Sequence, residues 1–233
     1  MKAVVLCAGV GSRLLPHTQY MPKTLVPVCG RPILEYQIEA LAGRVNGVIL
    51  AAGYLGDQLE PFAGEQVSLV HNPEYLTTNS IYSLWLVRDH VRGQEFLLLN
   101  GDVLFDSAVL DELLSDRAPT ALLVDRRAPL VAGEMNVVVR DGLVVEIGKH
   151  IPLSRANGQS LQMVRFAPSD SELLFGRIEE LVEAGDTGHF PTHAYERIFS
   201  RSAMSAVQRR GGTWFEIDTV DDLARCEEML GGC

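Results

Sequence analysis

Residues 2–14 read KAVVLCAGVGSRL, and this stretch decides the fold of the chain. The apolar run 2–7 predicts a buried parallel strand. Because glycine has no Cβ and tolerates positive φ, the loop that contains Gly9 and Gly11 lets backbone N–H groups approach an anion closely. Arg13 inside the loop, and Lys23 in the segment PKTLVPV at 22–28, add positive charge. The layout predicts a site that holds a nucleotide by its phosphates.

Other interpretations of the glycine loop are a tight turn that only changes chain direction and two familiar nucleotide motifs. A Walker loop ends in Gly-Lys-Ser/Thr, whereas this chain has Gly11-Ser12-Arg13. A dinucleotide fingerprint needs a third glycine at the position of Leu14. Both motifs are therefore excluded, and the turn remains the alternative.

Length and hydrophobic periodicity predict one α/β domain of 233 residues, because 47% apolar residues suffice for one substantial core. In the first half, strands are predicted at 2–7, 45–51, 67–71 and 96–99, and helices at 32–42, 55–62 and 80–91. This alternation is typical of a parallel, doubly wound sheet. In the second half, strands are predicted at 121–124, 135–139, 143–147, 161–166, 205–209 and 213–217, with an Asp141-Gly142 hairpin turn. Helices are expected at 170–184, 190–199 and 220–230.

The charge and cysteine content limit the partners and the compartment. A formal charge of −10 argues against general affinity for nucleic acid, which needs a basic surface. No apolar run is long enough to cross a bilayer and no signal peptide precedes the first strand, so a cytoplasmic protein with no membrane association is expected. The four cysteines, Cys7, Cys29, Cys226 and Cys233, lack metal or disulfide spacing and are predicted to be free thiols. A homodimer remains open.

Two carboxylates follow separate predicted strands. Asp102 follows the strand 96–99, and Asp218 directly follows the strand 213–217, just before the last predicted helix. Ligands of open α/β sheets bind at such strand ends, and paired carboxylates suit Mg²⁺, which prefers oxygen ligands. The alternatives are a turn residue for Asp102 and a helix N-cap for Asp218.

The loop, together with Pro22-Lys23-x-Leu25-x-Pro27-Val28, resembles the nucleotidylyltransferases of the sugar-1-phosphate type, and the resemblance covers nearly the whole chain. It implies a single Rossmann-like (glycosyltransferase-A-like) α/β domain over 1–233, with a mixed, mainly parallel central sheet flanked by helices. About 1–118 would form the nucleotide-binding half, and about 119–233 the acceptor-binding and metal half. By resemblance, Arg13 and Lys23 contact the phosphates, and Asp102 and Asp218 hold Mg²⁺. The nucleotide contacts are then expected at Leu6, Ala8, Gly9, Gly11 and Ser12 in and before the loop, and at Gly101 beside Asp102.

The segment HNPEYLTTNSIYSLW at 71–85 indicates which base is bound. Relatives that use dTTP or UTP usually carry glutamine followed by Asp-Gly-Leu-Ala here. This chain instead resembles the branch of bacterial phosphocholine and phosphonate cytidylyltransferases. Hydroxyl and amide groups of Thr78, Asn79 and Ser80 could then pair with cytosine, although one of them is expected to cap the following helix.

The acceptor site is predicted from the second half. Lys149 resembles the family lysine that approaches the acceptor phosphate, the alternative being a solvated loop lysine. Glu134 belongs to a branch segment in which Asn136 replaces a lysine. A trimethylammonium acceptor would need an aromatic cage, for which Phe190, Tyr195 and Trp214 are available. His189 and His193 suit an anionic or hydroxylated acceptor, unless they are plain surface residues. The residues predicted to bind the acceptor are Lys149, Glu134, His193, Tyr195 and Glu216.

The predicted function is therefore Mg²⁺-dependent transfer of CMP from CTP to a small phosphonate or phosphate monoester, with release of pyrophosphate. Arg13, Lys23 and Lys149 are the predicted catalytic residues. Three alternatives remain: a sugar-1-phosphate enzyme that uses UTP, dTTP or GTP, a non-catalytic nucleotide-binding domain, and a glycosyltransferase. The last typically carries Asp-x-Asp at the metal strand, whereas this chain has Asn100-Gly101-Asp102.

Overall fold

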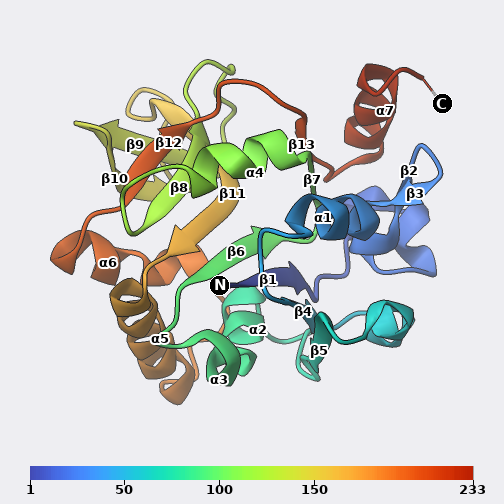
Figure 1. Cartoon of the computed structure of the whole chain (residues 1–233), viewed down its shortest axis with the longest axis horizontal. Helices are drawn as coiled ribbons and strands as arrows, with labels where there is room; N and C mark the ends of the chain where they lie inside the picture. Colours follow the sequence, from blue (N-terminus) through green and yellow to red (C-terminus); the bar gives the residue numbers. More distant parts are fainter. Residues whose placement is uncertain (233) are drawn as a thin grey trace.

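The computed structural model describes residues 1–232 and shows a large twisted sheet with helices on both sides (Figure 1). The strands of these residues are β1 (Lys2–Cys7), β2 (Pro27–Val28), β3 (Arg31–Pro32), β4 (Val48–Ala52), β5 (Val67–His71), β6 (Phe96–Asn100), β7 (Val103–Phe105), β8 (Ala121–Asp125), β9 (Asn136–Arg140), β10 (Leu143–Gly148), β11 (Gly158–Phe166), β12 (Ser205–Gln208) and β13 (Trp214–Glu216). The α-helices are α1 (Ile33–Leu41), α2 (Ser80–Leu86), α3 (Arg88–Val91), α4 (Ser107–Leu114), α5 (Pro168–Glu183), α6 (Glu196–Arg201) and α7 (Val220–Met229). Short 3₁₀ helices are η1 (Ser12–Leu14), η2 (His17–Gln19), η3 (Lys23–Leu25), η4 (Gly56–Phe62) and η5 (Pro191–Ala194).

The main sheet has nine strands in the order β5-β4-β1-β6-β11-β8-β12-β10-β9, with β11 also pairing with β9. The strands β5, β4, β1 and β6 pair in parallel, as the alternation of strands and helices predicts. Beyond β6 only β8 and β12 pair in parallel, and the other pairings are antiparallel. The mixed α/β class is confirmed, with a smaller parallel share than expected. Strands from both halves of the chain lie in this one sheet.

Alternate side chains of the buried strands pack into two cores, one on each face of the sheet. On β1, Val4 enters the core beneath α2, α3, α5 and α6, whereas Ala3 and Val5 enter the core beneath α1 and α4. This arrangement explains the continuous apolar runs, because a strand covered on both faces buries every second side chain on each side. A third, smaller core joins α7 to the segment before α1, through residues that include Leu14, Val26 and Leu223.

Several local predictions are corrected. The strand β7 and helix α4 lie in 103–114, where no element was predicted. The predicted helix 80–91 is divided into α2 and α3, and the predicted helix 190–199 into η5 and α6. Asp141 and Gly142 both have positive φ between β9 and β10, which confirms the hairpin turn.

Cys7 and Cys226 are free and buried, but Cys29 is disulfide-bonded, so the free thiol predicted there is wrong. Cys233 lies outside the described residues.

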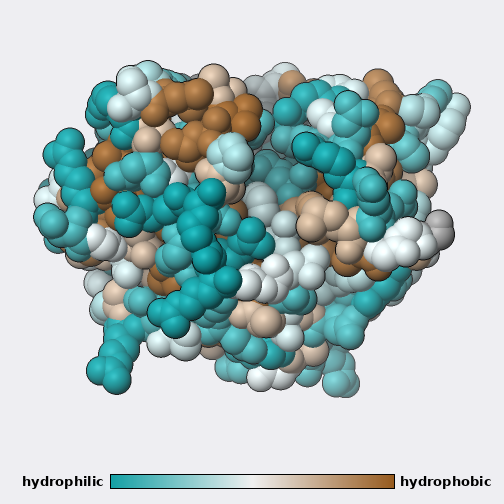
Figure 2. Space-filling view, turned by 90° about the horizontal axis from the view of Figure 1, so that it is seen from above, coloured by the Kyte–Doolittle hydropathy of each residue, from teal (hydrophilic) through white to brown (hydrophobic). Residues whose placement is uncertain are grey.

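The helices of residues 1–232 include none that is both long and apolar enough to cross a bilayer. Figure 2 looks down on the molecule from the top of Figure 1, and hydrophilic residues cover much of this face. Hydrophobic residues gather in separate groups at the left and right of that view, with hydrophilic residues between them.

Candidate active site

The glycine loop leaves the end of β1 and turns into η1. Gly11 has φ +67°, and a Cβ there would lie 3.0 Å from Thr18 Cγ2 and 3.1 Å from Lys23 Cβ. Thr18 Oγ1 also donates a hydrogen bond of 2.9 Å to the Gly11 carbonyl. A Cβ at Gly9 would meet nothing within 4 Å, so the space above Gly9 is open. The loop is thus held tightly at Gly11 and leaves room for a ligand at Gly9.

Two short strands bring the distant acidic residues together. β13 pairs antiparallel with β7, and Glu216 lies opposite Val103 in the register. The amide of Ile217 then donates a 2.9 Å hydrogen bond to the carbonyl of Asp102. Asp218 therefore comes just after the end of β13, next to Asp102, which comes just before the start of β7. The two acidic strand ends converge, as predicted, and carboxylate oxygens of Asp102, Glu216 and Asp218 lie within 4.8 Å of one another.

The basic residues predicted for phosphate binding meet the same cluster. The Lys23 ammonium bonds to the carboxylates of both Asp102, at 2.7 Å, and Asp218. Arg13 Nη2 lies 2.9 Å from Asp218 Oδ2, and its own side chain is 59% exposed. Burial lowers the pKa of Lys23, but the charges of Asp102 and Asp218 outweigh burial and raise that pKa above its usual value. Lys23 is therefore a firmly charged ammonium at the base of the site.

The contacts of Asp218 and Asp102 differ from those of a helix cap and of an ordinary turn residue. The N-cap of α7 is Thr219, whose hydroxyl accepts from the Asp222 amide, while the Asp222 carboxylate accepts from the Thr219 amide. Asp218 therefore does not cap the helix, and its carboxylate is free to face Lys23 and Arg13. One oxygen of Asp102, Oδ1, is buried and has no hydrogen-bond partner within residues 1–232. An unpartnered buried carboxylate oxygen is costly unless a donor or a cation reaches it.

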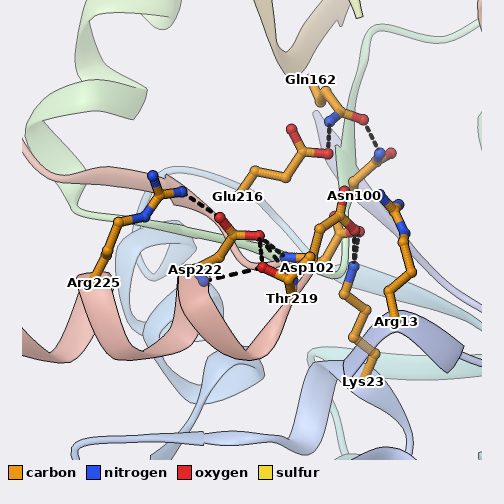
Figure 3. Close-up of polar contacts among 10 residues, drawn as sticks. Arg13, Lys23, Asn100, Asp102, Gln162, Glu216, Thr219, Asp222 and Arg225 are labelled. Carbon is orange, nitrogen blue, oxygen red and sulfur yellow. Dashed lines mark hydrogen bonds and ion pairs between the residues drawn. The ribbon is translucent and has the colours of Figure 1, made fainter. Parts of the chain in front are cut away.

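Gln162 is a residue of the site that the sequence does not reveal. Its side chain bridges two others, donating to the carboxylate of Glu216 and accepting from the Asn100 amide (Figure 3). Gln162 has φ +58° in the middle of β11, where the register with β8 shifts between Ser160 and Val164. A bulge of this kind re-aims a side chain, and positive φ is unfavourable for a non-glycine residue. Burial, then the charges of Asp102 and Asp218, raise the pKa of Glu216 to about 8. Glu216, predicted at the acceptor, thus belongs to the acidic cluster.

A cleft of about 210 Å³ opens beside the cluster and the glycine loop. The predicted nucleotide contacts that line it are Leu6, Ala8, Gly9, Lys23, Thr78, Asn79, Ser80 and Gly101, together with Asp102. A Cβ at Gly101 would lie 2.9 Å from the Leu6 carbonyl, so only glycine allows β1 and the chain after β6 to approach this closely. Gly11, Ser12 and Arg13 are not among the lining residues.

The segment 72–80 forms one wall of the cleft and has structural roles of its own. Asn79 is the N-cap of α2, since its Oδ1 accepts from the Ser80 amide at 2.7 Å. The hydroxyl of Thr78 donates to the Glu74 carbonyl and accepts from Asn72. Asn72 is 3% exposed and also donates to Ser83. The capping interpretation thus holds for Asn79, and the wall is fixed before any base binds. Asn72, Tyr75 and Ser83 are further lining residues that were not predicted.

A second cavity of about 490 Å³ lies beyond Phe190, which lines both it and the cleft. Lys149 and His193 line this second cavity, and Lys149 Nζ lies 5.6 Å from the centroid of the Phe190 ring. Tyr195 and Trp214, two of the three aromatic residues considered for a cage, do not line the second cavity. Tyr195 is 2% exposed and packs edge-on against Phe166. Trp214 donates its Nε1 hydrogen to the Leu161 carbonyl.

Glu134 and Tyr195, like Glu216, are predicted acceptor residues that do not line the second cavity. Glu134 is half-buried, and its charge contributes to the raised pKa of Glu216. Tyr195 lines only a narrow cavity of about 40 Å³ behind Phe190, and burial raises its pKa far above the usual value.

Comparison with known proteins identifies the family of this fold and site. Residues 3–186 match the MobA-like NTP transferase domain family. The chain belongs to this family. The solved CTP:phosphocholine cytidylyltransferase of Streptococcus pneumoniae superposes with a TM-score of 0.79 at 24% identity, over 98% of each chain. That likeness establishes the fold, and the predicted nucleotidyltransferase family is confirmed.

Two sequence relatives of this NTP transferase domain are cytidylyl-group enzymes by name. The choline-phosphate cytidylyltransferase of Streptococcus pneumoniae is 28% identical over 238 aligned residues, which cover 99% of this chain and 98% of that protein. The CMP-5'-(3-aminopropyl)phosphonate synthase of Streptomyces rubellomurinus is 37% identical over 152 residues, or 63% of this chain. Those residues are 24% of the synthase, so the match covers about a quarter of the length of that relative.

Proposed function

We propose that this protein transfers CMP from CTP to a small phosphonate or phosphate monoester and releases pyrophosphate. The observation that carries the proposal is the meeting of Lys23 with Asp102 and Asp218 at the edge of a cleft that the glycine loop also lines. Relatives named as cytidylyltransferases for phosphocholine and as a CMP-phosphonate synthase support the choice of nucleotide.

The acidic cluster fits a Mg²⁺ ion. The carboxylate oxygens of Asp102, Glu216 and Asp218 are hard ligands within one small space. Asp102 Oδ1 lacks a partner, and the Lys23 ammonium demonstrates that positive charge is stabilised between the two aspartates. When bound, Mg²⁺ would neutralise negative charge that develops at the α-phosphate.

In the proposed reaction an anionic oxygen of the acceptor attacks the α-phosphorus of CTP. The bond from that phosphorus to the bridging oxygen breaks, and pyrophosphate leaves with the electron pair. The acceptor is already ionised at neutral pH, so no side chain has to remove a proton. Arg13 and Lys23 would hold and neutralise the triphosphate, and Gly9 leaves room for it to approach the backbone. Thr78, Asn79 and Ser80 would border the base, and Lys149 would face the acceptor.

The proposal is tested by measuring pyrophosphate release with CTP, UTP, dTTP, GTP and ATP. Each nucleotide is combined with Mg²⁺ and a set of phosphonates, phosphocholine and sugar 1-phosphates. We expect release that requires an acceptor and is at least about 10-fold faster with CTP than with any other nucleotide, because the wall at 72–80 is rigid and polar. Preference for UTP, dTTP or GTP with a sugar 1-phosphate would favour the sugar-nucleotide alternative. CTP binding without turnover on any acceptor would favour a non-catalytic nucleotide-binding domain.

A further inference from the structure

If the proposed function holds, the second cavity receives the far end of the acceptor. Because Phe190 lines both the nucleotide cleft and the second cavity, an acceptor whose phosphonate or phosphate lies in the cleft can extend past this ring. The ionisable residues that line the second cavity are Glu146, Lys149, His150, His189, His193 and Glu196.

The acidic residues of this cavity already have cationic partners. Glu146 pairs with Arg155 and with His150, the latter at 3.4 Å. Glu196 lies 3.7 Å from an Nη atom of Arg177. Each of these two acids thus already has an arginine partner that offsets its negative charge.

The lysine and the histidines of the cavity have fewer carboxylate partners than its acids have cationic ones. His189 pairs with Asp186 at 2.8 Å, and the ring of His193 stacks on His189 with centroids 4.0 Å apart. Within residues 1–232, neither Lys149 nor His193 has a carboxylate within ion-pair distance. A lysine ammonium and an imidazole N–H that lack acidic partners are donors suited to an anion.

Among residues 1–232, Phe190 and Phe199 are the two Phe, Tyr or Trp side chains that line the second cavity, and one of them already faces a cation. Phe190, 43% exposed, is the ring that both cavities share. The Lys149 ammonium already lies 5.6 Å from its centroid, within the range of a cation–π contact. A second cation at the same ring would be repelled by Lys149.

We propose that the acceptor carries a carboxylate at the end opposite its phosphonate or phosphate, and that Lys149 and His193 bind this carboxylate. These two residues would thereby determine acceptor specificity. The positive charge of Lys149 would repel an acceptor with an ammonium group at that end and weaken its binding.

The test uses three phosphonates of matched length with the full chain, CTP and Mg²⁺: 3-phosphonopropionate, propylphosphonate and 2-aminoethylphosphonate. We expect kcat/KM to fall in that order, by about 10-fold or more between the carboxylate and the ammonium acceptor. Lys149→Ala and His193→Gln should each raise the KM for 3-phosphonopropionate and leave the KM for CTP unchanged. Lys2→Ala and His90→Gln, which alter residues that line neither cavity, should keep the wild-type order.

Fastest turnover of 2-aminoethylphosphonate, or a preference that survives both Lys149→Ala and His193→Gln, would overturn this inference while the proposed cytidylyl transfer stands. Absence of pyrophosphate release with all three phosphonates and with phosphate monoesters would overturn the proposed function and the inference with it.

Discussion

Replacing Lys23 with alanine is expected to lower kcat by about 10²- to 10³-fold, because the ammonium is a preorganised charge at the site where negative charge develops. Its charge is secured by bonds to both Asp102 and Asp218. The measurement is steady-state pyrophosphate release with saturating CTP and acceptor. Lys2→Ala is the matched control, since Lys2 donates to the His90 carbonyl, at 3.5 Å, and does not line the cleft.

The same substitution should also lower the stability of the folded protein. Lys23→Ala leaves two neighbouring carboxylates without their shared cation, and loss of one partner of a buried ion pair costs about 3 kcal/mol or more. The Lys23 side chain is 14% exposed, so this penalty applies with little screening by water. Added Mg²⁺ should therefore raise the Tm of Lys23→Ala more than that of the wild type. Near-wild-type turnover in a folded variant would remove Lys23 from the mechanism.

Asp218→Asn should lower kcat/KM by a similar factor of about 10²- to 10³-fold. The amide retains the shape of the side chain but loses the charge that pairs with Lys23 and Arg13 and that would hold Mg²⁺. The apparent affinity for Mg²⁺, measured from the metal dependence of the rate and from Mn²⁺ binding, should weaken in parallel.

Asp221→Asn supplies the control for this substitution. Asp221 is exposed in the first turn of α7 and loses the same charge three residues away. We expect its rate and metal affinity to match the wild type. Equal effects of Asp218→Asn and Asp221→Asn would mean that general charge, and not the cluster, governs activity.

Much of the amino-terminal half could be predicted, because the strands β1, β4 and β6 are covered on both faces and are therefore largely apolar. β1 matches its predicted bounds, and β6 extends the predicted strand by one residue. The meeting of Asp102 with Asp218 was also predicted, since both residues follow strands. The strand β7, whose pairing with β13 brings the two residues together, was not predicted. The strand β7 has three residues and follows β6 after a short turn, so it produces no periodic signal.

Other features depend on tertiary contacts that the sequence does not encode locally. The positive φ of Gln162 arises inside a strand, at a residue type that gives no sign of a bulge. Tyr195 comes two residues after the exposed His193 but packs against Phe166, so an aromatic residue considered for the acceptor belongs to the core. Glu216 joins the acidic cluster because β13 pairs with β7, a contact between segments more than a hundred residues apart.

The most direct test of the proposed site is a crystal structure of the protein with CTP and Mg²⁺. We expect a metal at about 2.1 Å from oxygens of Asp102 and Asp218, a triphosphate along the loop 9–13, and cytosine against Thr78–Ser80. A nucleotide bound away from the glycine loop, or a metal that touches neither aspartate, would contradict the proposed site.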